Sequence, residues 1–383
     1  MSMNWHPEIL LYTRLRKSPY FHASGKHGVE AYSVVNHQYH PRRYGDPVDE
    51  YWALVNDVTL WDVGAERQVE ITGPDAFDLT DMLTLRDLSE LEVDQCKYAL
   101  ITTQDGGVLS DPILLRVDEQ RFWFSTAEST LLPWALAAAH WSGLDVQVQE
   151  ADVGPVQVQG TKALEVMVDL FGESVRDIRH YWSKRYELDG MDVVVSQTGF
   201  TNVGGYEIYL EDASKHADRL WDTVYEAGQP HGLQVTGPVH INRIEAGILS
   251  YDADMTLDTN PLEVAFHYPW LEREIDQETP YIGQPALQHI RDQGVDRKLV
   301  GVEIAGESVG SYTDGSMPEA FPVHHNEQEV GFVSSACYSP RLKKNIGFAM
   351  VPVGLAENGT TLQVETWHGT ESATVVDKPF LKG

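Results

Sequence analysis

The sequence has little of what metal centres and disulfide frameworks are made from. Its 383 residues include only two cysteines, Cys96 and Cys337, which lie far apart and fit no metal-binding or redox spacing. We interpret both as buried, reduced thiols. The histidine pairs His37/His40 and His324/His325 have no cysteine or acidic residue nearby at a recognised ligand spacing. The sequence therefore predicts no metal site.

Basic residues are scarce as well. Lysine and arginine total 28 against 58 aspartate and glutamate residues, which gives a formal net charge of -30. A surface this acidic repels a phosphate backbone, so we expect no nucleic-acid partner. The acidic residues are dispersed along the chain, as on the solvated surfaces of salt-adapted proteins.

Long apolar runs are missing too. No run reaches the length of a membrane span, and residues 1–17 lack the order of charged, apolar and small residues found in a signal peptide. We therefore expect a cytoplasmic protein with no membrane partner. The glycine motifs of nucleotide-binding loops and the G-x-S-x-G elbow are absent, so neither nucleotide binding by those loops nor a hydrolase triad is indicated.

What the sequence does contain is an alternation of helical and strand periods. With 42% apolar and 10% aromatic residues, a chain of this length can build two or three domain cores. Helical periods occur at 47–58, 129–141 and 213–228. Runs rich in β-branched and aromatic residues occur at 67–73, 98–103, 112–117, 121–126 and 191–196. The pattern predicts an α+β protein.

One strand-to-helix unit recurs. "VEITGPDAFDLTDML" and "VQVQGTKALEVMVDLF" both run from a strand through a glycine into an amphipathic helix, and Gly73 and Gly160 are 87 residues apart (160 minus 73). We expect two related modules that pair in one domain. From about residue 295, strand-like segments separated by Gly, Asn and Pro turns predict a small β-barrel or sandwich, with a hinge and short helix at 280–290 before it.

Carboxylates beside glycine turns are the strongest candidates for a functional site. In "TTQDGGVLSDPILL", Asp111 opens an apolar strand after a Gly-Gly turn, where its side chain can point into a cleft. In "TGFTNVGGYEIYL", Glu207 and Tyr209 share one face of a strand, because residues two apart do so. Such a carboxylate and phenol can bind a flat, nitrogen-rich ring. The alternative is structural, with Asp111 capping a turn and Glu207 pairing with an arginine.

These motifs resemble those of the glycine-cleavage T-protein family, the tetrahydrofolate-dependent aminomethyltransferases. "GFTNVGGYEIYL" is similar to the family signature "RTGYTGEDGFEI", and further stretches match in the family's order at 102–113, 156–167, 241–254 and 334–351. The resemblance implies an α+β, T-protein-like three-domain ring around a central folate cavity, with a C-terminal β-barrel. The implied domains are residues 1–150 with part of 235–285, then 151–235, and a barrel of 286–383.

Within that family the chain looks most similar to the dimethylsulfoniopropionate demethylases. A T-protein is expected to carry "DVSHM" where this chain has "DVGAE" (62–66), and two aspartates where it has Ser110 and Asp111. Both departures speak against aminomethyl transfer. Gln197 stands where the T-protein signature has Arg, and Phe200 where the demethylases are expected to have Trp. The second departure leaves the exact methyl donor open.

The resemblance also implies roles for individual residues. Glu207 is expected to accept the amino and ring N–H donors of the pterin. The expected tetrahydrofolate-binding residues are Glu207, Tyr98, Asp111 and Phe200. The expected donor-binding residues are Phe200, Tyr209, Ser125, Arg14 and Arg16, with aromatic faces beside the sulfonium and arginines beside the carboxylate. Asp111 and Tyr209 are expected to be catalytic, with Asp111 steering the pterin N5 or receiving its proton.

Several alternatives remain open at this point. The basic cluster Arg14, Arg16 and Lys17 is equally consistent with a surface patch or with a site for the glutamate tail of the folate, and a water can replace Asp111 as proton acceptor. The donor can be another sulfonium, a methylamine or an aryl methyl ether, and the reaction can be glycine-cleavage aminomethyl transfer. A folate-binding protein without catalysis is a further candidate. The partners expected are a small methyl donor and folate, with a homodimer as a possible assembly.

Overall fold

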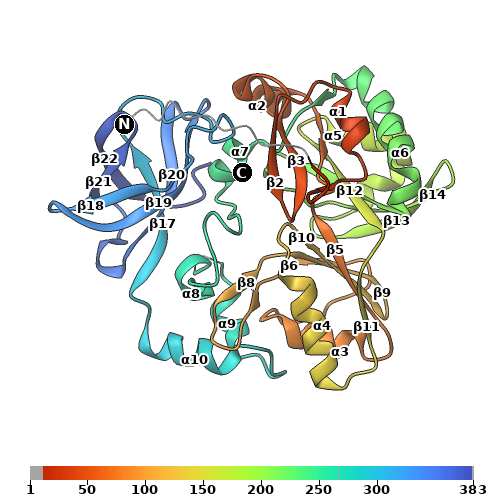
Figure 1. The fold of residues 1–383 in the computed structure, drawn as a ribbon, viewed down its shortest axis with the longest axis horizontal. Coiled ribbons are helices and arrows are strands. Elements are labelled where there is room, and N and C mark those ends of the chain that lie inside the picture. Colours follow the sequence, from red (N-terminus) through yellow and green to blue (C-terminus); the bar gives the residue numbers. More distant parts are fainter. Residues whose placement is uncertain (1–11, 267, 382–383) are drawn as a thin grey trace.

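The recurring unit predicted from the sequence organises the larger part of the molecule (Figure 1). The computed structural model describes residues 12–266 and 268–381. In it, Gly73 joins β5 (Arg67–Thr72) to α3 (Ala76–Leu83), and Gly160 joins β12 (Val153–Gln159) to α5 (Ala163–Phe171). These glycines have φ of +123° and +130°, and a Cβ would lie 2.5 Å and 2.6 Å from a backbone carbonyl oxygen. Only glycine fits such a turn, and the predicted repeat is confirmed.

The first unit lies in an antiparallel sheet with strand order β11-β5-β10-β9-β6. Its further strands are β6 (Cys96–Tyr98), β9 (Ile113–Asp118), β10 (Arg121–Thr126) and β11 (Gln147–Glu150). Helices α3 and α4 (Leu131–Ser142) cover one face of this sheet (Figure 1).

The second unit lies in a sheet with strand order β13-β14-β15-β12-β4-β16. Its further strands are β4 (Thr59–Asp62), β13 (Ser183–Leu188), β14 (Met191–Ser196), β15 (Gly205–Glu211) and β16 (Gln234–Val235). Helices α5 and α6 (Ala213–Gly228) cover one face, where Tyr206, Ile208 and Leu210 of β15 are buried in the core. Each unit thus has its own sheet and its own helical layer.

The faces that the helices leave open pack against each other. One buried apolar cluster draws from both sheets and consists of Cys96, Leu115, Val117, Trp123, Val153, Val194 and Tyr209. Because strand side chains alternate, β15 therefore buries one set of residues under the helices and the other set between the sheets. Cys96 and Cys337 are buried and free, as predicted.

One predicted strand is wrong. The run 98–103 is not a single strand, because β6 ends at Tyr98 and pairs with β9, whereas β7 (Ile101–Thr102) pairs with β8 (Val108–Ser110). The partner segment bends between β8 and β9 at Asp111 and Pro112, and a proline has no N–H to continue a ladder. The bend leaves Asp111 between two strands.

A small sheet of order β1-β3-β2 precedes the modules. Its strands are β1 (Arg16–Lys17), β2 (Ala31–Val35) and β3 (Gln38–Arg43), and α1 (Phe21–Gly25) and α2 (Pro47–Asn56) accompany them. Helix α2 begins where the sequence predicts, because Pro47 suits a first helical position and the Asp46 carboxylate accepts from the next backbone N–H groups.

Short helices lead from the second sheet to the barrel. They are α7 (His240–Ala246), α8 (Pro261–Val264), α9 (Leu271–Ile275) and α10 (Gln284–Gln293), the last of which confirms the helix predicted at 280–290. The closed barrel has the order β17-β20-β19-β18-β21-β22. Its strands are β17 (Arg297–Ile304), β18 (Phe321–His325), β19 (Gln328–Ser339), β20 (Lys344–Pro352), β21 (Thr361–Thr366) and β22 (Gly369–Val376).

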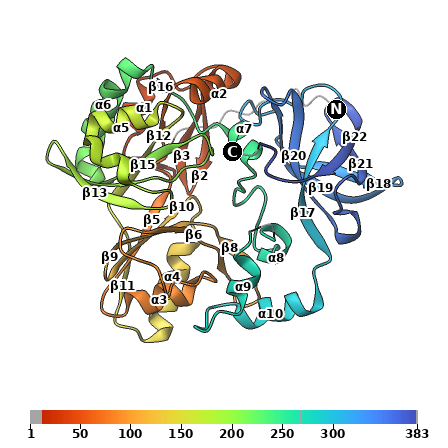
Figure 2. The same cartoon turned by 180° about the vertical axis from the view of Figure 1, so that it is seen from behind.

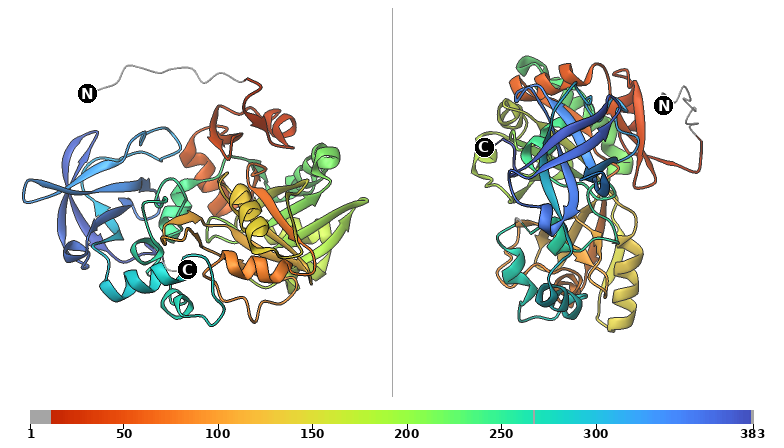
Figure 3. Two further views of the ribbon diagram at one scale, coloured as in Figure 1. Left: turned by 60° about the horizontal axis from the view of Figure 1, so that its bottom comes forward. Right: turned by 90° about the vertical axis from the view of Figure 1, so that its left-hand side faces the viewer.

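The arrangement of these parts leaves α7 at the centre of the molecule. Figures 2 and 3 show the barrel at one end and the two sheets at the other, with α7 and the chain that follows it between them. Residues from the barrel, from the helices α7 to α10 and from both modules share one apolar cluster that includes Trp61, Leu100, Ile244, Leu287 and Phe348. The centre is therefore the place where side chains from every part can meet.

Candidate active site

Strand β15 presents Glu207 and Tyr209 between the sheets. Both lie on the face opposite to the helix-packing residues of this strand, as the alternation of side chains predicts. Gln157 of β12 and Ser196 of β14 are the ladder partners of Glu207. The Tyr209 hydroxyl donates to Oε2 of Glu207 at 2.6 Å. The carboxylate and the phenol thus form one unit.

The Glu207 carboxylate is buried and held by neutral donors. Glu207 is only 3% exposed to solvent. Gln157 Nε2 donates to Oε1 at 2.5 Å, and the hydroxyl groups of Thr198 and Tyr209 donate to Oε2. Within the described residues no lysine or arginine forms an ion pair with Glu207, so the structural alternative of a Glu207–arginine pair is wrong. A carboxylate has about four acceptor positions, so one on Oε1 remains for a further donor.

Glu66 lies in the turn before β5 and faces the same region. The Ser125 hydroxyl donates to Glu66 Oε2 at 3.3 Å. Burial, followed by the negative charges of Glu207 and Asp111, raises the pKa of Glu66 to about 8, although the bond from Ser125 opposes the rise. Glu66 therefore carries a proton at neutral pH, and the group of three carboxyls is less negative than its composition suggests.

Replacing Glu66 by glutamine should change how stability depends on pH. The pKa of Glu66 in the folded chain lies above its ordinary value, so the folded state binds more protons than the unfolded state and stability falls as pH rises from about 4.5 to 8. Glu66→Gln removes this titration, and its free energy of unfolding should exceed that of the wild type by about 1–3 kcal/mol at pH 9 but not at pH 4.5.

Denaturant unfolding at both pH values measures this difference. Glu357→Gln makes the same change at an exposed position and serves as the control. If the free energies of unfolding of Glu66→Gln and of the wild type differ by the same amount at pH 4.5 and at pH 9, Glu66 is not the proton-binding group described.

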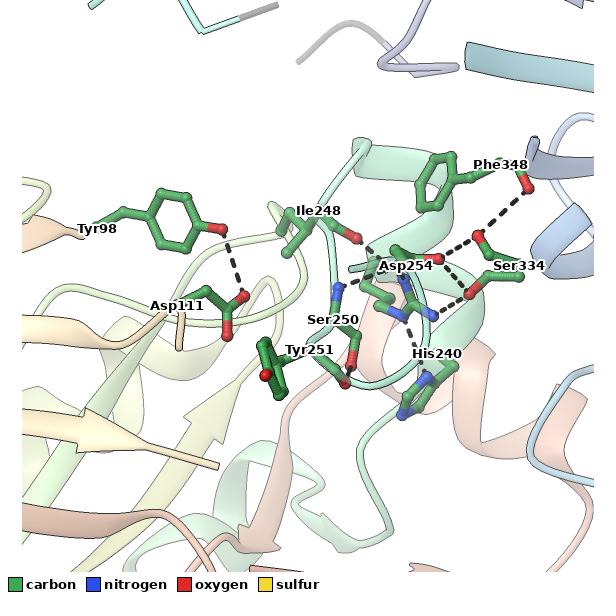
Figure 4. Close-up of polar contacts among 11 residues, drawn as sticks. Tyr98, Asp111, His240, Ile248, Ser250, Tyr251, Asp254, Ser334 and Phe348 are labelled. Carbon is green, nitrogen blue, oxygen red and sulfur yellow. Dashed lines mark hydrogen bonds and ion pairs between the residues drawn. The ribbon is translucent and has the colours of Figure 1, made fainter. Parts of the chain in front are cut away.

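Asp111 lies at the bend between β8 and β9, facing Tyr98 (Figure 4). The Tyr98 hydroxyl donates to Asp111 Oδ2 at 3.3 Å. Burial, with added contributions from the charges of Glu128 and Asp254, raises the pKa of Asp111 well above its usual range, and burial likewise raises that of Tyr98. Asp111 therefore holds its proton more tightly than an ordinary aspartate does.

Aromatic rings continue from Tyr98. The ring of Tyr268 lies 5.6 Å from that of Tyr98, and Trp270 stacks on Tyr268 at 5.5 Å. The Arg86 guanidinium lies 4.1 Å from the centre of the Trp270 ring, and it also pairs with the buried Glu274 at 2.6 Å. These rings form a wall on one side of the centre.

A cavity of about 470 Å³ opens beside these groups. Its lining includes Gln159, Thr198 and Gly205 from the second module, Ile248 after α7, and Tyr268. Thr198 lines the cavity and donates a hydrogen bond to Glu207. Tyr268 also lines the cavity, and its ring packs against that of Tyr98. Small-molecule sites commonly measure about 300–1,000 Å³. An aromatic wall and a buried carboxylate with a spare acceptor position fit a pterin, whose ring is flat and carries neighbouring N–H donors.

Some of the other residues that the sequence predicted for the site lie near the cavity and some lie at the protein surface. Phe200 packs edge-on against His240 with ring centres 5.8 Å apart, and Ser125 contacts Glu66. Arg14 is exposed, and Arg16 is a surface residue whose guanidinium pairs with Glu150 at 2.6 Å. The structure therefore brings Phe200, Ser125, Tyr98, Asp111, Glu207 and Tyr209 toward the centre. It places Arg14 and Arg16 at the surface, and their role in donor binding stays a prediction.

A buried ion pair near the centre escaped the sequence reasoning. Arg243 of α7 and Asp254 are both fully buried and pair at 2.6 Å. Arg243 also donates to Ser335 of the barrel at 2.7 Å, and Asp254 accepts from Ser334 at 2.6 Å. The signal was available in "INRIEAGILSYDAD", where the only arginine of the segment precedes an aspartate by eleven residues. The pair ties α7 to the barrel.

Within residues 12–266 and 268–381, no group of three or more His, Cys, Asp or Glu side chains is arranged to hold a metal ion. No helix in the same part of the chain is long and apolar enough to cross a membrane.

The fold and the cavity define a folate-binding transferase architecture, and comparison with known proteins gives the family. Residues 21–268 match the GCVT N-terminal domain, and residues 297–382 match the glycine cleavage T-protein C-terminal barrel domain. The chain belongs to this family. The resemblance expected from the sequence motifs is confirmed.

The similar proteins include two kinds of transferase. The chain is 34% identical over 362 residues to the dimethylsulfoniopropionate demethylase DmdA of Ruegeria pomeroyi, covering 94% of this chain and 96% of that protein. It is 28% identical over 375 residues to an aminomethyltransferase of Desulfitobacterium hafniense, covering 97% and 99%. The solved aminomethyltransferase T of Bartonella henselae superposes with a TM-score of 0.84 at 21% identity, over 96% of this chain and 98% of that one.

These findings confirm the predicted fold class and cofactor. The protein is a tetrahydrofolate-dependent enzyme of the T-protein family, with mixed helices and strands and a C-terminal closed barrel. The cavity of about 470 Å³ beside Thr198 and Tyr268 is the candidate site for this cofactor.

Proposed function

We propose that this enzyme demethylates dimethylsulfoniopropionate, giving methylmercaptopropionate and 5-methyltetrahydrofolate. In this reaction the methyl group leaves a sulfonium, the bonding electron pair stays on sulfur, and the N5 proton of the cofactor is released. The observation that carries the proposal is the 34% identity to the Ruegeria demethylase across nearly the whole chain. Tetrahydrofolate supplies, when bound, the nitrogen that takes the methyl group.

The residue at position 110 supports this choice over aminomethyl transfer. A T-protein is expected to have an aspartate there. In this chain Ser110 is fully buried, and its hydroxyl lies 3.2 Å from that of Thr126. A second carboxylate beside Asp111 is therefore missing from β8, and a hydroxyl pair fills its place.

The residues around the centre have distinct tasks in the proposed reaction. Glu207 orients the pterin by accepting its N–H donors, and the Tyr209 hydroxyl keeps the carboxylate in position. Tyr98 holds Asp111 in turn. A bound cation lowers the pKa of a nearby carboxyl, so a sulfonium donor favours the ionised form of Asp111, which is the form that can accept a proton. Asp111 can therefore take the proton released at N5.

Positioning accounts for most of the catalysis in this proposal. A sulfonium carries its own neutral leaving group, so the protein mainly has to hold donor and acceptor in line. Phe200 offers a ring face for the positive sulfur, and cation–π attraction in a dry site contributes about 2 kcal/mol. A neutral thioether lacks the charge on which this cation–π attraction depends.

The enzyme should therefore prefer a sulfonium donor to its neutral thioether analogue by at least tenfold in kcat/KM, following the cation–π contribution. The test incubates the protein with tetrahydrofolate and a panel of methyl donors and measures 5-methyltetrahydrofolate. Phe200→Leu should impair use of the sulfonium without changing folate affinity, and Phe200→Trp should keep activity. Phe332→Leu, at an exposed position on the barrel, is the matched control.

The same assay separates the competing functions. Equal turnover of charged and neutral donors contradicts the sulfonium assignment and leaves a methylamine or aryl ether as donor. Formation of methylenetetrahydrofolate from an aminomethylated carrier protein identifies an aminomethyltransferase. Binding of folate without turnover of any donor identifies a folate-binding protein without catalysis.

A further inference from the structure

An arginine without a carboxylate partner lies near the centre of this acidic protein. Arg42 is in β3, two residues after His40, so the two side chains share a face of the strand. Among the described residues, no aspartate or glutamate forms an ion pair with Arg42. It lies deep in the protein, yet part of its surface stays accessible. By contrast, the buried Arg243 pairs with Asp254 and Arg86 pairs with Glu274.

Backbone packing fixes where Arg42 lies. The segment that leads into α7 presses against β3 at this residue, because a Cβ on Gly237 would lie only 2.1 Å from the Arg42 carbonyl oxygen. His240, the first residue of α7, follows three positions later. Arg42 therefore stands beside the start of α7, on the side of the centre where the barrel loop with Tyr312 also packs.

His240 is held in one orientation next to Arg42. Its ring stacks on Tyr312 with centres 5.0 Å apart, and its Nδ1 accepts from Arg243 Nε at 3.1 Å. With Nδ1 as acceptor, a neutral imidazole carries its proton on Nε2, which leaves Nε2–H as a donor. Burial, then the charges of Arg42 and Arg243, lower the pKa of His240 well below its usual range. His240 thus offers an N–H without adding charge.

His40 completes the group. Burial, with the charge of Arg42, lowers the pKa of His40 to about 3, so this ring is neutral too. Its Nδ1 is buried and has no hydrogen-bond partner among the described residues. The groups that act on Arg42 or are acted on by its charge are thus Tyr312, Arg243, His40 and His240, and none of them is a carboxylate. A desolvated cation without a counter-charge is unfavourable, so this site favours an anionic ligand.

We propose that Arg42, with the Nε2–H group of His240, binds the carboxylate of the methyl donor. The inference rests on the proposed function, because it assigns the second end of a zwitterionic substrate. The ring of Phe200, proposed to face the sulfonium, lies 5.8 Å from the ring of His240. The two ends of the donor therefore have adjacent sites, one aromatic and one cationic. A planar guanidinium suits a carboxylate because it can donate two parallel hydrogen bonds.

The proposal assigns the carboxylate of the methyl donor to Arg42 in place of Arg14 and Arg16, the residues that the sequence suggested. Arg16 is already paired with Glu150, and Arg14 is exposed. A carboxylate also occurs on the glutamate tail of folate, so the ligand chemistry has two sources. Because His240 lies close to Phe200, the carboxylate of the methyl donor is favoured over that of the folate tail. The experiment distinguishes these two ligands.

The test compares dimethylsulfoniopropionate with its carboxamide, which keeps the sulfonium and loses the negative charge. Arg42→Gln should raise the KM for dimethylsulfoniopropionate at least tenfold and change the KM for the carboxamide less than twofold. Arg42→Lys should recover part of the loss, because it restores the charge without the bidentate geometry. Arg43→Gln changes the neighbouring arginine, which points to the other face of β3 and lies 3.8 Å from Glu30, and should leave both constants unchanged. Thermal unfolding of each variant checks that the fold is retained.

A second arm measures binding without turnover. Calorimetry with methylmercaptopropionate should show binding to the wild type and a loss of at least tenfold with Arg42→Gln. This result supports the site even if no sulfonium is demethylated, in which case only the proposed function fails. If sulfonium demethylation proceeds and Arg42→Gln affects acid and carboxamide equally, the site is wrong and the function stands. If Arg42→Gln weakens tetrahydrofolate but not tetrahydropteroate, Arg42 binds the glutamate tail and the proposal is overturned.

Discussion

Replacing Arg243 by methionine should lower the free energy of unfolding by about 3–5 kcal/mol, because it leaves the buried charge of Asp254 without its partner. Asp254 would keep its hydrogen bonds from the hydroxyl groups of Ser334 and Ser335 and from the backbone N–H of Ser250, none of which carries a charge. The pair also connects α7 to the barrel, so the loss should appear as earlier release of the barrel from the sheets. Denaturant unfolding followed by tryptophan fluorescence measures both effects.

Two variants show whether the effect belongs to the buried charge. Arg176→Met removes an arginine from an exposed pair with Glu173, and such surface pairs contribute only about 0–1 kcal/mol. Arg243→Met combined with Asp254→Leu removes both charges and should be more stable than Arg243→Met alone. If the double variant is as unstable as the single one, lost packing and not an unpaired charge causes the damage.

The parts of the fold that local pattern determines were predicted well. The helix at 213–228 and the strand at 191–196 have the bounds that periodicity predicts, because each buries one face against its own module. The two glycines of the repeated unit were found because their role is local, at a turn that no other residue can make. The barrel was predicted for a similar reason, since short strands between turns dominate the chain after residue 295.

Features that depend on a distant partner were missed. The run 98–103 has the composition of one strand, but it is divided because Pro112 lies in the segment opposite. The protonation of Glu66 depends on Glu207, which is 141 positions away (207 minus 66). Neither relation is visible in a local window of sequence.

The arginines illustrate the same limit. In the sequence Arg42 and Arg43 are an ordinary basic pair beside two histidines, and the cluster of Arg14, Arg16 and Lys17 is more prominent. In the fold, Arg16 pairs with Glu150 of β11 at the surface, whereas no aspartate or glutamate in the part of the chain that the structure describes forms an ion pair with Arg42. Which cation remains free for an anionic ligand is decided by the packing of β3 against α7. Composition alone gave no way to choose.

Replacing Glu207 by glutamine should weaken tetrahydrofolate binding by about 2–4 kcal/mol, or roughly 30- to 700-fold. Gln157, Thr198 and Tyr209 all donate to this side chain, so an amide NH₂ in place of either oxygen meets a donor instead of accepting from it. The same substitution also removes the negative charge that strengthens a bond to the N–H groups of the pterin. Calorimetric titration of the variant with tetrahydrofolate measures the change.

Glu211→Gln is the matched control, because Glu211 lies four residues later on the same face of β15 but pairs with Arg121 and Arg185 at the rim. It should leave folate affinity unchanged. Tyr209→Phe removes one donor while the carboxylate stays, so it should cost less folate affinity than Glu207→Gln. An unaltered folate affinity in a folded Glu207→Gln protein would mean that this carboxylate serves only the packing of the two sheets. In that case the cavity beside Thr198 would have to orient the pterin through Tyr268 and the backbone around Gly199 and Gly205, which line it.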